Sequence, residues 1–225
     1  MKLCVLENLY AALPFEESLK KLHDLGIDTL ELGAGGYPGK AHCDPEILLN
    51  NEEEYKKFLA LLDKYGMHVA ALGAHGNNVH PDKKIAEAYD KDFRNAVLLA
   101  EKMGIDTVIT FSGCPGGSPV DRTPNWATCA WPEDYLEVLD YQWNKVLIPY
   151  WKEQAEFAKA HGIKKIAFEM HPGFCVYNPE TLLKLRNAVG DIIGANFDPS
   201  HLFWQGIDPV AAIRYLGEQN AIYFF

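Results

Sequence analysis

The feature of this sequence that most constrains its fold is a repeated junction, in which a helical stretch ends at a glycine and an apolar run follows. The five copies are LGIDTLELG, YGMHVAALG, MGIDTVITF, HGIKKIAFE and VGDIIGANF, with Gly26, Gly66, Gly104, Gly162 and Gly190 at the junctions. Glycine adopts a positive φ at little steric cost, which suits the residue that ends a helix. Near-continuous apolar runs alternating with helices are typical of a parallel sheet covered by helices.

This alternation predicts an α/β fold with seven parallel strands and a helical segment after each of the first six. Two helices carry start signals, because Asn178 and Asp208 each precede a proline and can cap the first turn. The strands are expected to begin near Lys2, Thr29, His68, Thr107, Lys165, Ile192 and Ala221.

An open doubly wound sheet and a (β/α)₈ barrel both fit this order of elements. A barrel has eight strands and about 250 residues. If the fold is a barrel, the last βα unit is missing from this chain, and we expect the native protein to be longer. We expect residues 1–225 to form a single domain.

Charge and cysteine content disfavour several classes of protein. The net charge is −10 and no basic run is present, so nucleic acid is not an expected partner. Apolar runs are far shorter than the roughly 18 residues of a membrane span, and the first residues do not have the pattern of a signal segment, so secretion is not expected. Five scattered cysteines without CxxC spacing favour neither disulfides nor a zinc knuckle. We expect a cytoplasmic protein, and a homo-oligomer remains open.

Polar side chains follow most of the predicted strands at the point where the apolar run ends. In a parallel barrel the C-terminal ends of the strands carry the active site, so these side chains are the candidate site. Glu7 takes such a place after the first strand. The later candidates are Glu31, His75 in AHGN, Glu169 and His171 in FEMHP, and Asp198 and His201 in NFDPSH.

Glu169 and Asp198 follow runs expected to be buried, and a buried carboxylate is costly unless it is paired or binds a cation. Carboxylates with imidazoles suit Mn²⁺, Mg²⁺, Co²⁺ or Zn²⁺. The alternative is a structural role for either carboxylate, as a loop cap or in an ion pair. His75 either belongs to the site or orders a loop, and Glu31 either contacts the ligand or is satisfied by a neighbour. The histidines expected to be structural are His23, His42, His68, His80 and His161.

A long connection over 113–144 is rich in glycine, proline and tryptophan, and it far exceeds the usual βα loop of about 2 to 6 residues. We interpret it as an active-site loop in which Trp126, Trp131 and Trp143 wall off a sugar, although Trp143 also fits a buried helix. Cys114 is not predicted to be a nucleophile, because no partner base is identifiable.

Together, AHGN, FEMHP and NFDPSH followed by GIDP resemble the xylose isomerase-like TIM-barrel superfamily, which includes sugar phosphate isomerases and ketose 3-epimerases. The resemblance covers the whole chain and favours the barrel. It implies that Glu169 is a metal ligand and one of two acid/base carboxylates, that Asp198 is a second ligand, and that His201 contacts substrate or metal. It also implies a histidine ligand on strand 7 and a glutamate, the other acid/base group, on strand 8. Neither lies within these residues, since strand 7 reads IYFF.

The implied function is metal-dependent isomerisation or epimerisation of a small keto-sugar or inosose through an enediolate. A lyase or dehydratase that acts on a keto-sugar or keto-glycoside is one alternative, and a non-catalytic barrel that binds a sugar or a partner protein is another. An apurinic endonuclease is disfavoured by the negative charge and by the absence of histidine from TFSG after strand 4. The expected substrate-binding residues are Glu31, His75, His171 and His201.

Overall fold

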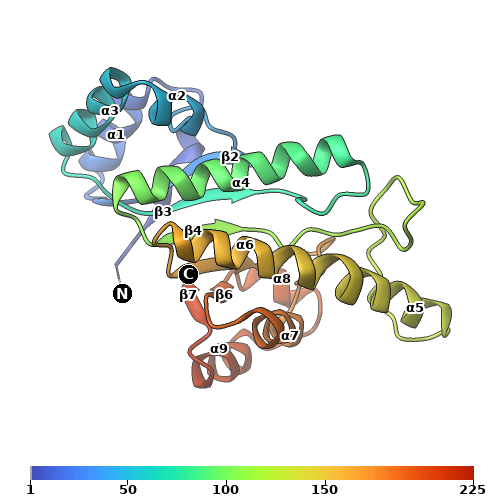
Figure 1. The fold of residues 1–225 in the computed structure, drawn as a ribbon. Helices are drawn as coiled ribbons and strands as arrows, with labels where there is room; N and C mark the ends of the chain where they lie inside the picture. Colours follow the sequence, from blue (N-terminus) through green and yellow to red (C-terminus); the bar gives the residue numbers. More distant parts are fainter. Residues whose placement is uncertain (1) are drawn as a thin grey trace.

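The computed structural model describes residues 2–225, which build one sheet of seven parallel strands (Figure 1). Each strand pairs with the next one along the chain. The predicted alternation is confirmed, and each predicted start lies within one residue of the observed one, except that of the first strand. The strands are β1 (Val5–Leu6), β2 (Thr29–Gly36), β3 (His68–His75), β4 (Thr107–Thr110), β5 (Lys165–Glu169), β6 (Ile193–Asn196) and β7 (Ile222–Phe224).

The first strand is shorter than predicted, because it begins at Val5 and pairs only two residues with β2. The chain then turns into the 3₁₀-helix η1 (Glu7–Tyr10). The buried Glu7 side chain accepts a hydrogen bond from Ser18 Oγ, and its Oε1 lies 2.8 Å from His42 Nδ1. These polar contacts with segments that follow β1 and β2 take the place of further strand pairing.

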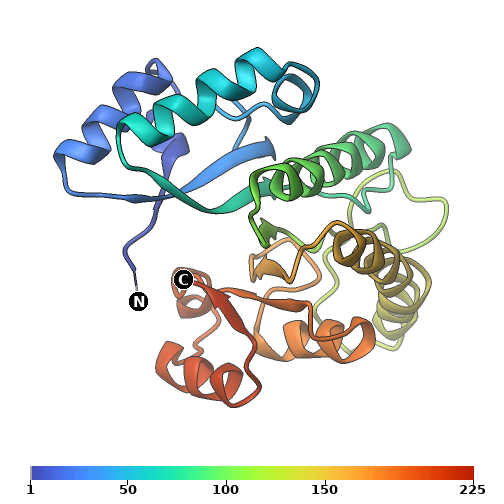
Figure 2. The same ribbon diagram turned by 60° about the vertical axis from the view of Figure 1, so that its left-hand side comes forward.

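The helices surround the strands and form the outer layer of the fold (Figure 2). Among residues 2–225, no helix combines the length and the apolar character needed to cross a membrane. The α-helices are α1 (Phe15–Asp24), α2 (Pro45–Asn50), α3 (Glu52–Lys64), α4 (Lys83–Met103), α5 (Asp134–Asp140), α6 (Ile148–Ala160), α7 (Pro179–Val189), α8 (Ser200–Phe203) and α9 (Pro209–Glu218).

The predicted ends of the helices are confirmed. Asn178 accepts a hydrogen bond from the Thr181 amide at the start of α7, and Asp208 accepts one from the Val210 amide at the start of α9. All five junction glycines have positive φ, for example 73° at Gly104. Both signals therefore mark the boundaries that the sequence predicts.

The sheet curls into most of a TIM barrel (Figure 2). Its two edges are β1 and β7, and within the described residues no strand pairing joins them. The edges lie near each other, because Cys4 and Leu6 line the same cavity as Phe224 and Phe225. This arrangement confirms a barrel with seven strands and without a final βα unit in this chain.

The core has two parts that follow from the alternation of side chains along each strand. The larger part fills the space between sheet and helices. The smaller part consists of Ala71, Ile109 and Ala167 from β3, β4 and β5, against which Tyr223 and Phe224 pack. Successive side chains of a strand point to opposite faces, so residues two positions further along these strands point into the barrel as well.

The long connection after β4 is shorter than predicted. A helix, α5, already begins at Asp134, and it continues through the π-helix η2 (Tyr141–Leu147) into α6. Trp143 is 3% exposed and belongs to the core, whereas Trp131 is 74% exposed. The many prolines and glycines before 134 mask the helical pattern that follows them.

Candidate active site

The alternation of side chains carries four of the predicted residues into the barrel above its small inner core. Glu169 lies two residues beyond Ala167 on β5, and His75 lies four residues beyond Ala71 on β3. Glu31 on β2 is in register with Ala71. His171 follows Glu169 at the end of β5. The strands thus bring together residues that are far apart in sequence.

Glu169 is the centre of the cluster, because side chains from β3, from β6 and from the segment after β6 contact its carboxylate. Its Oε1 lies 2.9 Å from His201 Nε2, and its Oε2 lies 3.2 Å from His75 Nε2. Asn196 Nδ2 donates a hydrogen bond of 3.4 Å to Oε2. The carboxylate is thus oriented by two imidazoles and an amide.

Three side chains of this region lie close enough together to hold a cation. Glu169, His171 and His201 each offer one ligand atom, and these atoms lie within 4.8 Å of one another. His171 Nδ1 lies 2.7 Å from the Pro172 carbonyl oxygen. A carbonyl only accepts, so Nδ1 carries the proton and Nε2 keeps its lone pair for a ligand.

Asp198 lies at the edge of this group. Its Oδ2 is 3.5 Å from His201 Nε2, and its Oδ1 accepts a hydrogen bond from the Ser200 amide. Its side chain is 40% exposed, so it is less buried than expected for a carboxylate after an apolar run. The segment after β6 turns into α8 at this point and carries Asp198 outward.

Glu31 and His75 form a second polar group in the barrel. Glu31 is 6% exposed, and its Oε1 has no hydrogen-bond partner among residues 2–225. His75 Nδ1 is likewise buried and without a partner in the described chain. One of the two roles expected for Glu31 was a hydrogen bond to a neighbouring side chain, and the structure contains no such bond to Oε1 among the described residues. A Cβ on Gly73 would lie 2.7 Å from Glu31 Oε1, so this glycine makes room for the carboxyl.

The two carboxyl groups have pKa values shifted in opposite directions. Burial raises the pKa of Glu31 to about 7. The nearby His75 lowers this pKa by a smaller amount, and the nearby Glu169 raises it further. Burial also raises the pKa of Glu169, but the hydrogen bonds and attraction of His75 and His201 outweigh it and hold this pKa below its ordinary value. Near neutral pH, Glu169 is therefore ionised, whereas Glu31 is about half protonated.

A cavity of about 460 Å³ opens between these groups. It is within the size range of small-molecule sites. Glu31, His75, Glu169, Asn196 and Asp198 contribute polar atoms to its wall. His171 and His201 are not part of this wall, although His201 contacts Glu169 and Asp198, which are. Glu169 therefore faces both the cavity and the histidine pair.

Phenylalanine side chains flank the histidines. Phe111 stacks on Phe174 with ring centroids 4.3 Å apart, and its ring lies 4.7 Å from that of His75 and 5.0 Å from that of His171. The tryptophans predicted to form this wall lie elsewhere, except that Trp126 Nε1 donates to the Phe174 carbonyl. These phenylalanines were missed because they look like ordinary apolar residues at the ends of strands.

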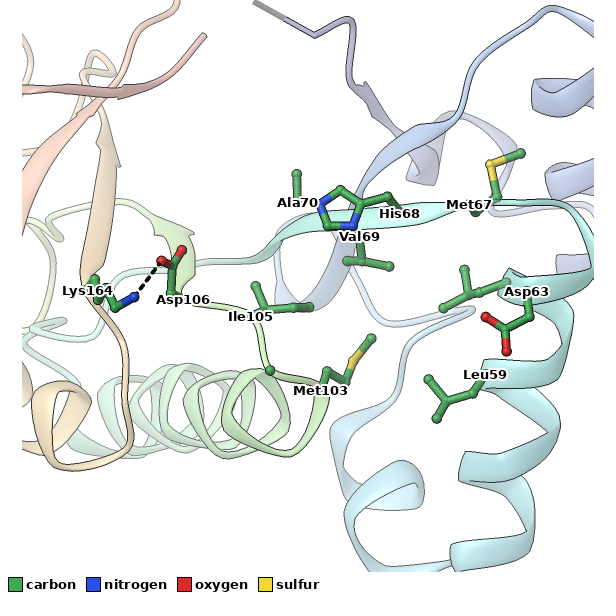
Figure 3. A pocket seen from close by; sticks show the side chains of 12 residues that line it. Leu59, Asp63, Met67, His68, Val69, Ala70, Met103, Ile105, Asp106 and Lys164 are labelled. Atoms are coloured by element: carbon green, nitrogen blue, oxygen red, sulfur yellow. Dashed lines mark ion pairs between the residues drawn. The ribbon is translucent and has the colours of Figure 1, made fainter.

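A second hollow, of about 450 Å³, lies at the opposite end of the barrel (Figure 3). Its wall comes from strand starts and helix ends, including His68 and Ile105. Asp106 and Lys164 pair across 3.6 Å within it. Because catalytic groups of parallel barrels lie at the C-terminal ends of strands, we do not assign it to the active site.

The remaining predicted residues lie outside the cluster. Glu7 is not part of the site that contains Glu31, because Ser18 and His42 bind its carboxylate. His42 Nε2 in turn donates a hydrogen bond to the Leu13 carbonyl. His80 Nδ1 accepts from the Asp82 amide just before α4. Asn196 and Gly73 were missed as site residues. Asn196 had a signal, because like Glu169 it is the last residue of a strand.

Comparisons with known proteins identify the family. A model of the xylose isomerase-like TIM barrel matches residues 19–224. The uncharacterized protein YfiH of Bacillus subtilis (strain 168) is 42% identical over 219 residues, which cover 96% of this chain and 70% of YfiH.

Solved structures share the fold at low sequence identity. The probable 3-DHS dehydratase AsbF of Bacillus anthracis, involved in petrobactin synthesis, has a TM-score of 0.68 at 16% identity, over 99% of this chain and 71% of that one. D-psicose 3-epimerase in the presence of D-fructose has a TM-score of 0.65 at 14% identity, over 100% of this chain and 72% of that one. The chain belongs to the xylose isomerase-like TIM barrel family.

Proposed function

We propose that this protein is a metal-dependent isomerase or epimerase that moves a proton next to the carbonyl of a small keto-sugar or inosose. The observation that carries the proposal is Glu169, an ionised and half-buried carboxylate held by two imidazoles beside a cavity of sugar size. The family of the chain and the ketose 3-epimerase fold among its structural neighbours support the same class of reaction.

The donor set fits a divalent cation. Glu169, His171 and His201 would hold it, with Asp198 as a further ligand from the exposed side. One carboxylate with two neutral imidazoles suits Mn²⁺, Co²⁺ or Zn²⁺, and Asp198 adds the oxygen donor that Mg²⁺ prefers. When bound, such a cation would stabilise negative charge on the oxygens of the substrate.

Each neighbouring side chain has a role in the proton transfer. Glu169 takes the proton from the carbon next to the carbonyl, which leaves an enediolate. His75 and Asn196 contact Glu169 Oε2 and keep the carboxylate directed at the reacting carbon. Glu31 and His75 present unpaired polar atoms that suit sugar hydroxyl groups. The rings of His171 and Phe111, which contact each other, bound the site next to Glu169.

A lyase or dehydratase reaction is the second candidate, because loss of a leaving group from the enediolate begins with the same proton removal. The stacked Phe111 and Phe174 rings, with the exposed Tyr37 ring 6.0 Å from Phe111, favour a substrate that carries an apolar group. Product analysis distinguishes the two, since elimination releases a second molecule or water and epimerisation does not.

Solvent exchange tests the proposed function. The protein with Mn²⁺ is incubated in D₂O with D-fructose, D-psicose and 2-keto-myo-inositol, and deuterium incorporation is followed by NMR. We expect deuterium on the carbon next to the carbonyl of at least one of them, and none after addition of EDTA. The control variant is Glu53→Gln, which replaces an exposed carboxylate on α3 and should exchange as the wild type does. Absence of exchange with every compound would refute the proposal.

A further inference from the structure

Two buried cysteines that lie far apart in the sequence come together in the fold. Cys114 follows β4 and Cys175 follows β5, and these two strands are neighbours in the sheet. The Cys175 amide donates a hydrogen bond of 3.0 Å to the carbonyl of Gly113, the residue before Cys114. The Val176 amide donates one of 2.9 Å to Ser112 Oγ, so the two segments are joined at successive positions.

The two thiols are in contact with each other. The Cys175 thiol donates a hydrogen bond to Cys114 Sγ, which lowers the pKa of Cys114 and raises that of Cys175. Asn77 holds Cys114 in place, because its side chain accepts a 2.9 Å hydrogen bond from the Cys114 amide and donates one of 2.9 Å to the Cys114 carbonyl oxygen. Two thiols that a fixed backbone keeps in contact can be bridged without a large movement of the chain.

We propose that Cys114 and Cys175 are a redox-active pair, which a peroxide converts into a disulfide and a dithiol reduces again. This inference is independent of the proposed function. The wide spacing of the cysteines in the sequence conceals the pair, because the pairing of β4 with β5 creates it. Cys129, by contrast, is exposed, and its thiol donates a hydrogen bond to the Trp131 carbonyl.

A small oxidant has a route to this pair. Cys175 lines a cavity of about 490 Å³ whose wall comes from α7, from η2 and from the connection after β4, for example at Lys184 and Ala127. Cys114 is only 1% exposed. The burial of the pair therefore favours a reagent of the size of hydrogen peroxide over a bulky one such as oxidised glutathione.

The oxidation balances as a two-electron step. The Cys114 thiolate attacks one oxygen of hydrogen peroxide, the O–O bond breaks and hydroxide leaves, so that Cys114 becomes a sulfenic acid. The Cys175 sulfur then attacks the Cys114 sulfur, the S–S bond forms and the S–O bond breaks. The protons of the two thiols end on the hydroxide ions, so the products are one disulfide and two water molecules. The lowered pKa of Cys114 favours the first step, because the thiolate is the nucleophile.

The disulfide would tie together two segments that flank the candidate site. Phe174, which precedes Cys175, stacks on Phe111, and its ring lies 5.7 Å from that of His171. The bond between Cys114 and Cys175 would also close a loop of about 60 residues, which restricts mainly the unfolded chain. We expect the oxidised protein to have a Tm about 5–15 °C higher than that of the reduced protein.

Peptide mapping tests the proposal. The wild type is treated with one equivalent of hydrogen peroxide, digested with trypsin in the absence of a reductant, and examined by mass spectrometry. We expect peptides 103–122 and 166–184 to be joined with the loss of two hydrogen atoms. The free thiols counted in denaturant should fall by two from the five of the reduced chain. Dithiothreitol should restore all of them and reverse the rise in Tm.

Two variants separate the pair from the other thiols. Cys175→Ser should form no joined peptide and show no rise in Tm, and dimedone should trap the sulfenic acid at Cys114. Cys129→Ser is the control variant and should form the disulfide as the wild type does. The proposal is overturned if Cys114 and Cys175 stay free, pair with other cysteines, or oxidise to sulfinic acids without linking. The wild-type map alone decides this, whether or not a variant folds.

Discussion

Replacement of Glu31 by glutamine is expected to stabilise the fold by an amount that grows with pH. Burial raises the pKa of Glu31 from 4.5 to about 7, so between these values the folded protein holds a proton that the unfolded chain has lost. The free energy of unfolding therefore falls as the pH rises through this window. Below about pH 4 the group costs nothing, and above about pH 8 the folded state bears the full cost of a buried charge.

The magnitude follows from the two pKa values. Moving the pKa from 4.5 to about 7 corresponds to about 3 kcal/mol at high pH. Glutamine has nearly the shape of the neutral carboxyl group and carries no charge. The variant should thus exceed the wild type in stability by roughly 1 kcal/mol at pH 5.5 and by about 3 kcal/mol at pH 8.5. For a chain of this size the larger value raises Tm by roughly 6–12 °C.

Urea unfolding followed by tryptophan fluorescence measures this difference. EDTA is included, because a cation near Glu169 would itself lower the pKa of Glu31. Glu7→Gln is the matched control, since Glu7 is equally buried but bonded to Ser18 and His42, and its replacement should destabilise the fold at both pH values. A Glu31→Gln variant whose advantage does not change with pH, or which is less stable than the wild type at pH 8.5, would refute the reasoning.

Three further predictions concern other residues of the candidate site. Glu169→Gln should lower deuterium exchange at least about 100-fold with an unchanged circular dichroism spectrum, and retained exchange would remove Glu169 as the base. Asp198→Asn should weaken Mn²⁺ binding about tenfold and His171→Gln more, measured by calorimetry; an unchanged affinity would show that the residue replaced is not a ligand. Gly73→Ala places a Cβ 2.7 Å from Glu31 Oε1 and should cost about 1–3 kcal/mol in urea unfolding, whereas an unchanged stability would mean that the carboxyl moves freely.

The fold was predictable because its boundaries have local physical causes. A residue with positive φ at Gly104 and a capping side chain at Asn178 act within a few residues of themselves, so they can be read without the tertiary structure. The same is true of Glu169 and His75, because strand alternation and strand ends determine which way they point. The first strand differs because Glu7 finds partners in distant segments, which no local pattern reveals.

The candidate site was less predictable where it depends on space rather than on residue type. Gly73 matters because it leaves room for the Glu31 carboxyl, and Phe111 matters because it contacts two histidines. Both look unremarkable in sequence. The exposure of Asp198 depends on the turn into α8, and the place of Trp143 in the core depends on a helix that the surrounding prolines conceal.

Binding of Mn²⁺ to the cluster around Glu169 is the most direct test of a metal-dependent site. Metal-free protein is titrated with Mn²⁺, and the free ion is counted by electron paramagnetic resonance, for the wild type and for Glu169→Gln. One bound ion per wild-type chain, with affinity at least about tenfold lower in the variant, is the predicted result. Equal binding by both proteins, or no binding by the wild type, would contradict the assignment of Glu169 as a ligand.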